Sequence, residues 1–481
     1  MVQKDTPLYT KLVDFQQKRN ISFHVPGHKN GLLLSKHKQK WEENIFGYDL
    51  TELSGLDDLH APTEVILHAE KLLAQLYKVK SSYFLVNGST VGNLAMILAS
   101  VQAGEGVFIQ RNSHKSIMNG ISLVKAKPVL LSPEYNSEWG VEEAISVRTL
   151  KKAIQLYPLI KVLIITSPNY YGKVGDLKGI IKLAHKHDIK VLVDEAHGAH
   201  FIASDYFPQS AVEWGADIVI QSAHKTLPAL TMGAYLHFNS NKIQQEMVER
   251  YLAMLQSSSP SYLIMASLDV ARSYIGTFNE EDGEYLIKKI NEFRDELSKI
   301  NSIRVLSYKD GMGDPLKITI QSAYGLSGFE LQKLLEGEGI YTELADTLNV
   351  LFIFPLLKKD IEYPLQQALV KIKQALQPTV SKKQDLIEQG LAINLEPNIV
   401  ELKLGEEEQL GRGKKQIGLD KSIHYISAET IVPYPPGIPL LLSGEEITSD
   451  HIKQLQNLVK SGAKFQGSST IYNYKITVFT E

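Results

Sequence analysis

One lysine follows a buried-looking strand in the stretch "DIVIQSAHKTLPAL". Lys225 stands directly before a run with almost no charge. An ammonium group is costly to bury unless it gains a partner or its pKa shifts. Lys225 is therefore either half of a structural salt bridge or a reactive amine, and this stretch alone favours neither interpretation.

Three other predicted strand ends carry polar groups. Ser89 and Thr90, in "NGST", open a helix, where free N–H groups and hydroxyls suit a phosphate. His114 lies in "RNSHKS" after the strand "GVFIQ", and Asp194 ends the apolar strand "VLVD". Each also has an ordinary structural interpretation, as a helix cap, a surface histidine or an ion pair.

A metal site formed by Asp194, His197 and His200 is a further alternative. The sequence offers no additional ligand cluster and no "HExxH" stretch to support it. We therefore expect no metal ion.

Together, the four strand ends match what pyridoxal 5′-phosphate (PLP) requires of a protein. A lysine forms the Schiff base, a carboxylate keeps the pyridine nitrogen protonated, hydroxyls hold the phosphate, and a flat side chain covers the ring. The order along the chain also fits, with the phosphate turn first, then His114, Asp194 and Lys225. The sequence thus predicts a PLP site with Lys225 as its reactive amine.

These residues need elements that bring them to one place. From about residue 66, apolar strand-like runs alternate with helical periodicity, which predicts an α/β fold with a mostly parallel sheet covered on both faces. Ligands bind beyond the carboxyl ends of the strands in such sheets. A small α+β unit and a further C-terminal α+β unit are expected to follow. We predict four parts: an N-terminal segment 1–65, a PLP-binding large domain 66–295, a small domain 296–380 and a C-terminal domain 381–481.

Composition sets the broad class of protein. The 481 residues are 43% hydrophobic and 22% charged, and the formal net charge of -3 gives no reason to expect nucleic acid or an anionic membrane as a partner. No apolar run is long enough to span a bilayer. The chain has no cysteine, which excludes disulfides and thiolate chemistry and fits a cytoplasmic protein.

The sequence resembles the fold-type-I PLP-dependent enzymes and, among them, the compact Orn/Lys/Arg decarboxylases of Gram-positive bacteria. The similarity runs from end to end of the chain. The stretches that carry it are "TPLY", "HVPGHKNG", "LDDLHAPTE", "NGST", "RNSHKSIMNG", "VLVDEAHGAH", "SAHK" and "PYPPGIPLLLSGEE". Where the family often has "NGTS" this chain has "NGST", so the resemblance leaves open which hydroxyl reaches the phosphate.

The resemblance implies a role for each matching residue. Lys225 carries the cofactor, Asp194 pairs with the pyridine nitrogen, and His114 stacks on the ring. The remaining cofactor contacts are expected from Ser89, Thr90, Ser222 and His224 at the phosphate and from Thr166, Ala196 and His197 around the ring. After loss of CO2, the α-carbon is expected to be protonated by Lys225 or by a nearby histidine, His224 or His114.

The resemblance also implies decarboxylation of a basic amino acid to a polyamine-type amine, with arginine the first choice of substrate, lysine the second and ornithine the third. Asp57, Asp58 and Glu445 are candidates for binding its cationic end, although acidic loop residues more often cap helices or face solvent. A homodimer or dimer of dimers with active sites at the interface is expected. An aminotransferase, an aldolase-type enzyme and a non-enzymatic PLP-binding homologue are the alternatives.

Overall fold

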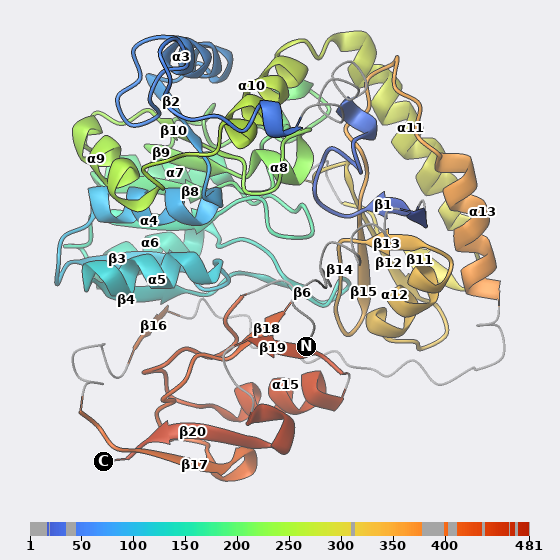
Figure 1. The fold of residues 1–481 in the computed structure, drawn as a ribbon. Helices are drawn as coiled ribbons and strands as arrows, with labels where there is room; N and C mark the ends of the chain where they lie inside the picture. The colour runs from blue at the N-terminus through green and yellow to red at the C-terminus, as the bar shows by residue number, and fades with distance from the viewer. Residues whose placement is uncertain are drawn as a thin grey trace, which may run out of the picture.

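The computed structural model comprises a large domain, a small α+β part beside it and a C-terminal unit below both (Figure 1). The residues that it describes are 17–18, 20–34, 45–308, 313–377, 399–402, 411–434, 438–460, 462–466 and 470–480. In this part of the chain, no helix is long and apolar enough to cross a membrane.

An eight-stranded sheet forms the centre of the large domain. Its strands, in spatial order, are β16 (Ile399–Glu401), β4 (Lys127–Leu131), β3 (Gly106–Gln110), β7 (Val162–Thr166), β8 (Lys190–Asp194), β9 (Ile218–Gln221), β10 (Ala234–Phe238) and β2 (Ser81–Leu85). The five strands from β4 to β9 pair in parallel, whereas β16, β10 and β2 each join an antiparallel neighbour. The predicted α/β class with a mostly parallel sheet is confirmed.

Alternating side chains of each strand enter two separate cores. In β7, Val162 and Ile164 face one core, while Leu163 and Ile165 face the other. The first core is completed by α4 (Gly88–Ser100), α5 (Lys115–Val124) and α9 (Gln245–Leu255). The second is completed by α3 (Val65–Tyr77), α6 (Val147–Leu156), α7 (Leu177–Lys186), α10 (Tyr262–Gly276) and α11 (Glu280–Ser298). Both faces are covered, which explains why the parallel strands are almost wholly apolar.

The small part is built on an antiparallel sheet. Its strands, in spatial order, are β11 (Ile303–Val305), β12 (Lys317–Ser322), β15 (Asn349–Ile353) and β14 (Leu344–Ala345). The helix α12 (Gly328–Gly337) packs against it, and α13 (Leu365–Leu376) packs against α12. Beside them, β13 (Ile340–Thr342) pairs in parallel with β1 (Ile21–Phe23). A strand of the predicted N-terminal segment therefore belongs to the small part.

The C-terminal unit has its own small core around Leu419, Ile431 and Leu455. Its elements are β17 (Lys414–Gly418), β18 (Val432–Tyr434), α15 (Ser449–Lys460), β19 (Lys464–Gln466) and β20 (Lys475–Phe479). The predicted boundary between residues 380 and 381 lies outside the described residues. β16, which we expected in the C-terminal domain, instead extends the large sheet beside β4.

The remaining short elements lie in the connections. They are the hairpin strands β5 (Tyr135–Asn136) and β6 (Val141–Glu142), the single-turn helix α8 (Ala223–Thr226), and the 3-10 turns η1 (Leu32–Leu34), η2 (Ile45–Gly47), η3 (Phe201–Ala203), η5 (Leu419–Lys421) and η6 (Ile471–Asn473).

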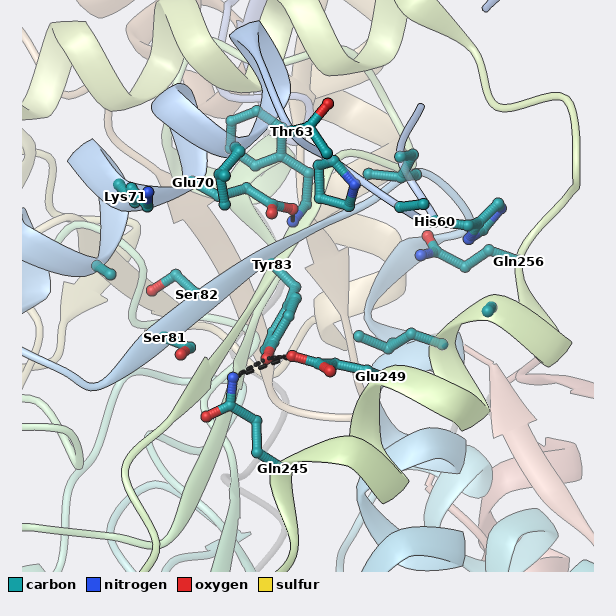
Figure 2. Close-up of a pocket in the computed structure, with 18 of the residues that line it drawn as sticks. His60, Thr63, Glu70, Lys71, Ser81, Ser82, Tyr83, Gln245, Glu249 and Gln256 are labelled. Atoms are coloured by element: carbon teal, nitrogen blue, oxygen red, sulfur yellow. Dashed lines mark hydrogen bonds between the residues drawn. The ribbon is translucent and has the colours of Figure 1, made fainter. Parts of the chain in front are cut away.

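The outer edge of β2 borders a cavity of about 540 Å3, which is separate from the residues of the predicted PLP site. Figure 2 shows Glu70 entering this cavity from α3 and Gln256 from the end of α9. Glu70 Oε1 accepts the N–H of Phe84 at 2.8 Å, and Gln256 Oε1 accepts the N–H of Val86 at 2.8 Å. Two side chains thus accept hydrogen bonds from N–H groups at the outer edge of β2, which could otherwise pair with another strand.

The Glu70 carboxyl should make the stability of the fold depend on pH. The side chain is only 5% exposed, and burial raises its pKa to about 8. Folded protein therefore keeps a proton that the unfolded chain releases above about pH 4.5, so this group's contribution to stability falls as pH rises towards 8. Glu70→Gln keeps the acceptor without the charge.

We expect Glu70→Gln to match the wild type near pH 5 and to exceed it near pH 8 by on the order of 1–2 kcal/mol in unfolding free energy. Unfolding curves of both proteins at the two pH values measure this difference. An equal change of stability with pH in both proteins would contradict the assignment to Glu70.

Candidate active site

The carboxyl edge of the large sheet brings the predicted residues together. Thr166 and Asp194 are the last residues of β7 and β8 and are paired in register. Ser222 follows the end of β9, and Lys225 lies in the single-turn helix α8 directly after it. Residues that are far apart in sequence therefore meet at the ends of neighbouring strands, as parallel pairing requires.

The amine of Lys225 has an imidazole as its near neighbour. Lys225 Nζ lies 3.0 Å from His197 Nε2 and 5.6 Å from the centre of the Tyr170 ring. Burial lowers the pKa of Lys225, while the charges of Asp194 and Glu343 act in the opposite direction. The lower pKa favours the neutral amine, which is the nucleophilic form.

Asp194 is a buried carboxylate without a hydrogen-bonded cation in the described part of the chain. Only 2% of it is exposed. Its Oδ2 accepts from Asn93 Nδ2 at 2.9 Å, and its Oδ1 accepts from the backbone N–H of Ala196 at 3.2 Å. A carboxylate in this position is suited to pairing with a protonated base on a ligand.

Asn93 links Asp194 to His114. The same amide nitrogen donates to Ser116 Oγ at 2.9 Å, and that oxygen lies 2.9 Å from His114 Nδ1. His114 caps α5, because its Nδ1 accepts the N–H of Ser116. Burial lowers the pKa of His114, although the Asp194 charge raises it. Asn93 was not predicted as a site residue from the sequence, where its signal is an amide one helical turn after Ser89 on the apolar helix α4.

Two hydroxyls meet at the start of α4. Ser222 Oγ donates to Ser89 Oγ at 2.8 Å, and the preceding Gly88 has φ +78°. Thr90 lies in the same turn but is exposed. Of the two adjacent hydroxyls in "NGST", that of Ser89 therefore points towards the lysine helix. The free N–H groups at this helix start add anion-binding capacity.

The other predicted cofactor contacts occupy the same edge. His224 Nδ1 bonds the carbonyl of Gly233 at 3.0 Å, and burial lowers the pKa of His224 to about 4. Thr166 Oγ1 donates to Ser113 Oγ at 3.2 Å. His200 bonds Asp314 at 3.0 Å rather than facing Asp194, and the described residues contain no group of three or more His, Asp or Glu arranged to hold a metal ion.

An N-terminal loop packs against α8. The N–H of Gly27 donates to the carbonyl of His224 at 2.6 Å, and a Cβ on Gly27 would lie 2.6 Å from the carbonyl oxygen of Leu227. Only glycine allows this approach. Lys29, in the same loop, is 1% exposed and donates to the carbonyl of His24 at 2.7 Å.

Glu343 is the main carboxylate that the sequence analysis missed. It follows β13 in the small part, and its Oε2 accepts the N–H of Val25 at 2.8 Å. Its negative charge raises the pKa values of Lys225, Lys29 and Lys317, although burial lowers that of Lys29 to about 7 and that of Lys317 to about 8. No local pattern in the sequence marks Glu343, because it reaches the site only through the packing of the two domains.

The candidate substrate residues of the first loop have backbone partners instead. Asp57 accepts N–H groups from five residues, Asp58, Thr63, Glu64, Ile66 and Leu67. It therefore caps the start of α3 from a distance in sequence. Asp58 Oδ1 accepts the N–H of His60 at 2.8 Å. These contacts correspond to the capping alternative.

Glu445, the third candidate, joins the C-terminal unit to the large domain. Its Oε2 pairs with Arg111 Nη2 at 2.9 Å, and both side chains are largely buried. Arg111 also donates to the carbonyls of Pro439 and Leu440. The carboxylate thus completes a clamp between β3 and the C-terminal unit.

The fold and this edge define an α/β protein with a buried lysine–aspartate site, and known proteins identify its family. The family model for the Orn/Lys/Arg decarboxylase major domain matches residues 6–310, and the model for the C-terminal domain of the same family matches residues 399–471. The chain belongs to the Orn/Lys/Arg decarboxylase family, as the sequence motifs indicated.

Individual relatives agree with this assignment. The chain is 40% identical to the uncharacterized protein YaaO of Bacillus subtilis over 99% of both chains. It is 35% identical to the arginine decarboxylase of Bacillus subtilis over 100% of this chain and 99% of the relative. The solved constitutive lysine decarboxylase of E. coli shares the fold with a TM-score of 0.73 at 20% identity, covering 99% of this chain and 82% of the other.

Glu445→Gln should affect stability rather than substrate affinity. The change leaves the largely buried Arg111 without its carboxylate, so we expect a loss of roughly 1–3 kcal/mol in unfolding free energy and an unchanged KM. Glu446→Gln is the matched control, because Glu446 bonds the exposed His424. A raised KM with unchanged stability would instead restore Glu445 as a substrate residue.

Proposed function

We propose that this protein is a PLP-dependent decarboxylase of a basic amino acid, with arginine the first choice of substrate. The observation that carries the proposal is Lys225, an amine whose pKa is lowered by burial and on which the charge of the buried carboxylate Asp194 acts. Membership of the family and the 35% identical relative named arginine decarboxylase support the same reaction and substrate.

The side chains at the carboxyl edge fit PLP chemically. Asp194 has no hydrogen-bonded cation among the described residues and is suited to holding a proton on the pyridine nitrogen. Ser89 and Ser222 place two hydroxyls at a helix start, where a phosphate binds well. The residues proposed to hold the cofactor are Lys225, Asp194, His114, Ser89, Thr90, Thr166, Ala196, His197, Ser222 and His224.

When bound, PLP supplies an electron sink for the α-carbon that loses its carboxylate. Lys225 supplies the neutral amine that attaches the cofactor. Burial lowers the pKa values of both His114 and His224, so neither imidazole readily carries a positive charge at neutral pH. Lys225, His224 and His114 stay the three candidates for protonating the α-carbon, because burial lowers the pKa of each of them.

The cationic end of the substrate needs an acidic partner. Asp57, Asp58 and Glu445 are engaged by backbone N–H groups or by Arg111, which argues against all three within one chain. Glu343 is the additional carboxylate whose charge acts on Lys225. We therefore add Glu343 to the candidates for charge recognition.

We further propose a homodimer or dimer of dimers and a cytoplasmic location. Membership of the family supports the assembly, and the absence of cysteine fits a reducing compartment. Light scattering of the purified protein tests the assembly, and a monomer would contradict it.

Activity assays test the reaction. Release of CO2 from arginine, lysine and ornithine should be measured side by side, with the fastest turnover expected for arginine. Lys225→Ala should abolish the visible absorbance of bound PLP and lower the rate by about 10²–10⁴-fold or more, because the attaching amine and one candidate proton donor are removed together. Formation of a keto acid without CO2 would favour an aminotransferase, and an active, coloured Lys225→Ala protein would sink the assignment of Lys225.

A further inference from the structure

A second buried lysine reaches Lys225 through one histidine. Lys317 Nζ lies 3.1 Å from His197 Nδ1, and His197 Nε2 lies 3.0 Å from Lys225 Nζ. Lys317 is the first residue of β12 in the small part, whereas the other two residues follow strands of the large sheet. His197 is 3% exposed and Lys317 is 0% exposed, so the hydrogen bond between these two residues is shielded from water.

The hydrogen-bonding capacity of the three side chains determines which atoms carry protons along these two hydrogen bonds. An ammonium group can only donate, so a protonated Lys317 requires an unprotonated Nδ1 on His197. A neutral imidazole with a free Nδ1 carries its proton on Nε2. That N–H then donates to Lys225, whose nitrogen must accept and must therefore be the neutral amine.

We propose that Lys317 is a positioning residue that fixes the Nε2–H tautomer of His197 and thereby keeps the Lys225 amine unprotonated and reactive. The inference rests on the proposed function only in treating Lys225 as the reacting amine. It goes beyond that function because it assigns a role to a residue of the small part.

The pKa values of Lys317 and His197 agree with this placement of the protons. Burial lowers the pKa of Lys317 to about 8, against the opposite influence of Asp314 and Glu343, so its ammonium form predominates at pH 7. Burial lowers the pKa of His197 far below its ordinary value, and the charge of Lys317 lowers it further. His197 is thus neutral and has a single N–H to donate.

The surroundings of Lys317 hold its side chain in place. A Cβ on Gly172 would lie 2.6 Å from Lys317 Cγ, and Gly172 has φ +81°. Asp314 is 0% exposed and bonds His200 at 3.0 Å, which fixes one of the two carboxylates that act on the ammonium.

Several titratable and aromatic groups act on Lys225. Asp194 and Glu343 favour its charged form, while burial opposes that form. Tyr170 presents its ring to the amine, and His197 contacts it directly. His114 and His224 lie close enough for the lysine charge to lower their pKa values. Substitution of Lys317 leaves all these groups in the protein.

The test measures the protonation of Lys225 itself. In full-length protein freed of PLP, the rate at which an amine-directed reagent labels Lys225 is followed against pH by mass spectrometry of the peptide that contains it. Lys317→Met removes the ammonium, so we expect the midpoint of labelling to rise by about one pH unit. Lys317→Arg keeps the cation and should restore the midpoint to within a few tenths of the wild type. Lys190→Met is the matched control, because Lys190 begins β8 at the opposite end of the sheet and should leave the midpoint unchanged.

The same substitution in a His197→Phe variant distinguishes an effect transmitted through the His197 hydrogen bonds from direct charge repulsion between the two lysines. In His197→Phe protein, adding Lys317→Met should move the midpoint by less than half the shift seen with His197 present, because the link is already broken. An equal shift in both backgrounds, or no shift with His197 present, would overturn the proposal. Thermal unfolding of each variant confirms that the compared proteins are folded. Because labelling needs neither PLP nor substrate, its outcome is distinct from failure of the proposed decarboxylation.

Discussion

The site depends on the burial of amines at the carboxyl edge of a parallel sheet. Three lysines with strongly reduced exposure to water gather there, and burial lowers the pKa of each. They are Lys29, Lys225 and Lys317. Carboxylates offset only part of this cost, because Glu343 and Asp194 act on Lys225 without a direct salt bridge in the described chain. Burial therefore makes loss of the proton easier for each amine, and an amine must be unprotonated to act as a nucleophile.

The polar groups around the lysine are ordered by neutral donors rather than by ion pairs. Asn93 connects the Asp194 carboxylate to Ser116, and Ser116 in turn contacts His114. Such a network fixes the orientation of the carboxylate while leaving its charge uncompensated by a protein cation. The arrangement is suited to a cationic ring nitrogen. Burial, and not this network, lowers the pKa values of the nearby imidazoles of His114, His197 and His224.

Much of this organisation could be predicted from the sequence. The strand "GVFIQ" coincides with β3, and the strand ends at Asp194 and Ser222 lie at one edge, because apolar parallel strands reveal themselves by composition and direct their carboxyl ends together. Asn93, Glu343 and Lys317 could not be found in the same way. Their roles depend on contacts between elements far apart in the chain, and their local sequence resembles an ordinary helix or strand.

The structural roles of the acidic residues proposed to bind the substrate could not be predicted from the sequence for a related physical reason. An aspartate in an irregular loop satisfies several backbone N–H groups as readily as it binds a cation, and Asp57 does the former. Its hydrogen-bond partners follow it within ten residues. The sequence therefore offered a capping role as an alternative, but it could not decide between capping and substrate binding. Glu445 needed a partner, Arg111, that only the three-dimensional arrangement supplies.

The N-terminal strand ties the two domains to the lysine mechanically. β1 is a parallel neighbour of β13 in the small part, and four residues after β1 the N–H of Gly27 bonds the helix turn that carries Lys225. A displacement of the small part away from the large sheet must therefore either break this ladder or pull on the Gly27 bond. The same movement would carry Glu343 and Lys317 away from the amine. The surroundings of the lysine therefore depend on how the two domains are held together, and nine residues near the beginning of the chain, from Ile21 to Lys29, contact both of them.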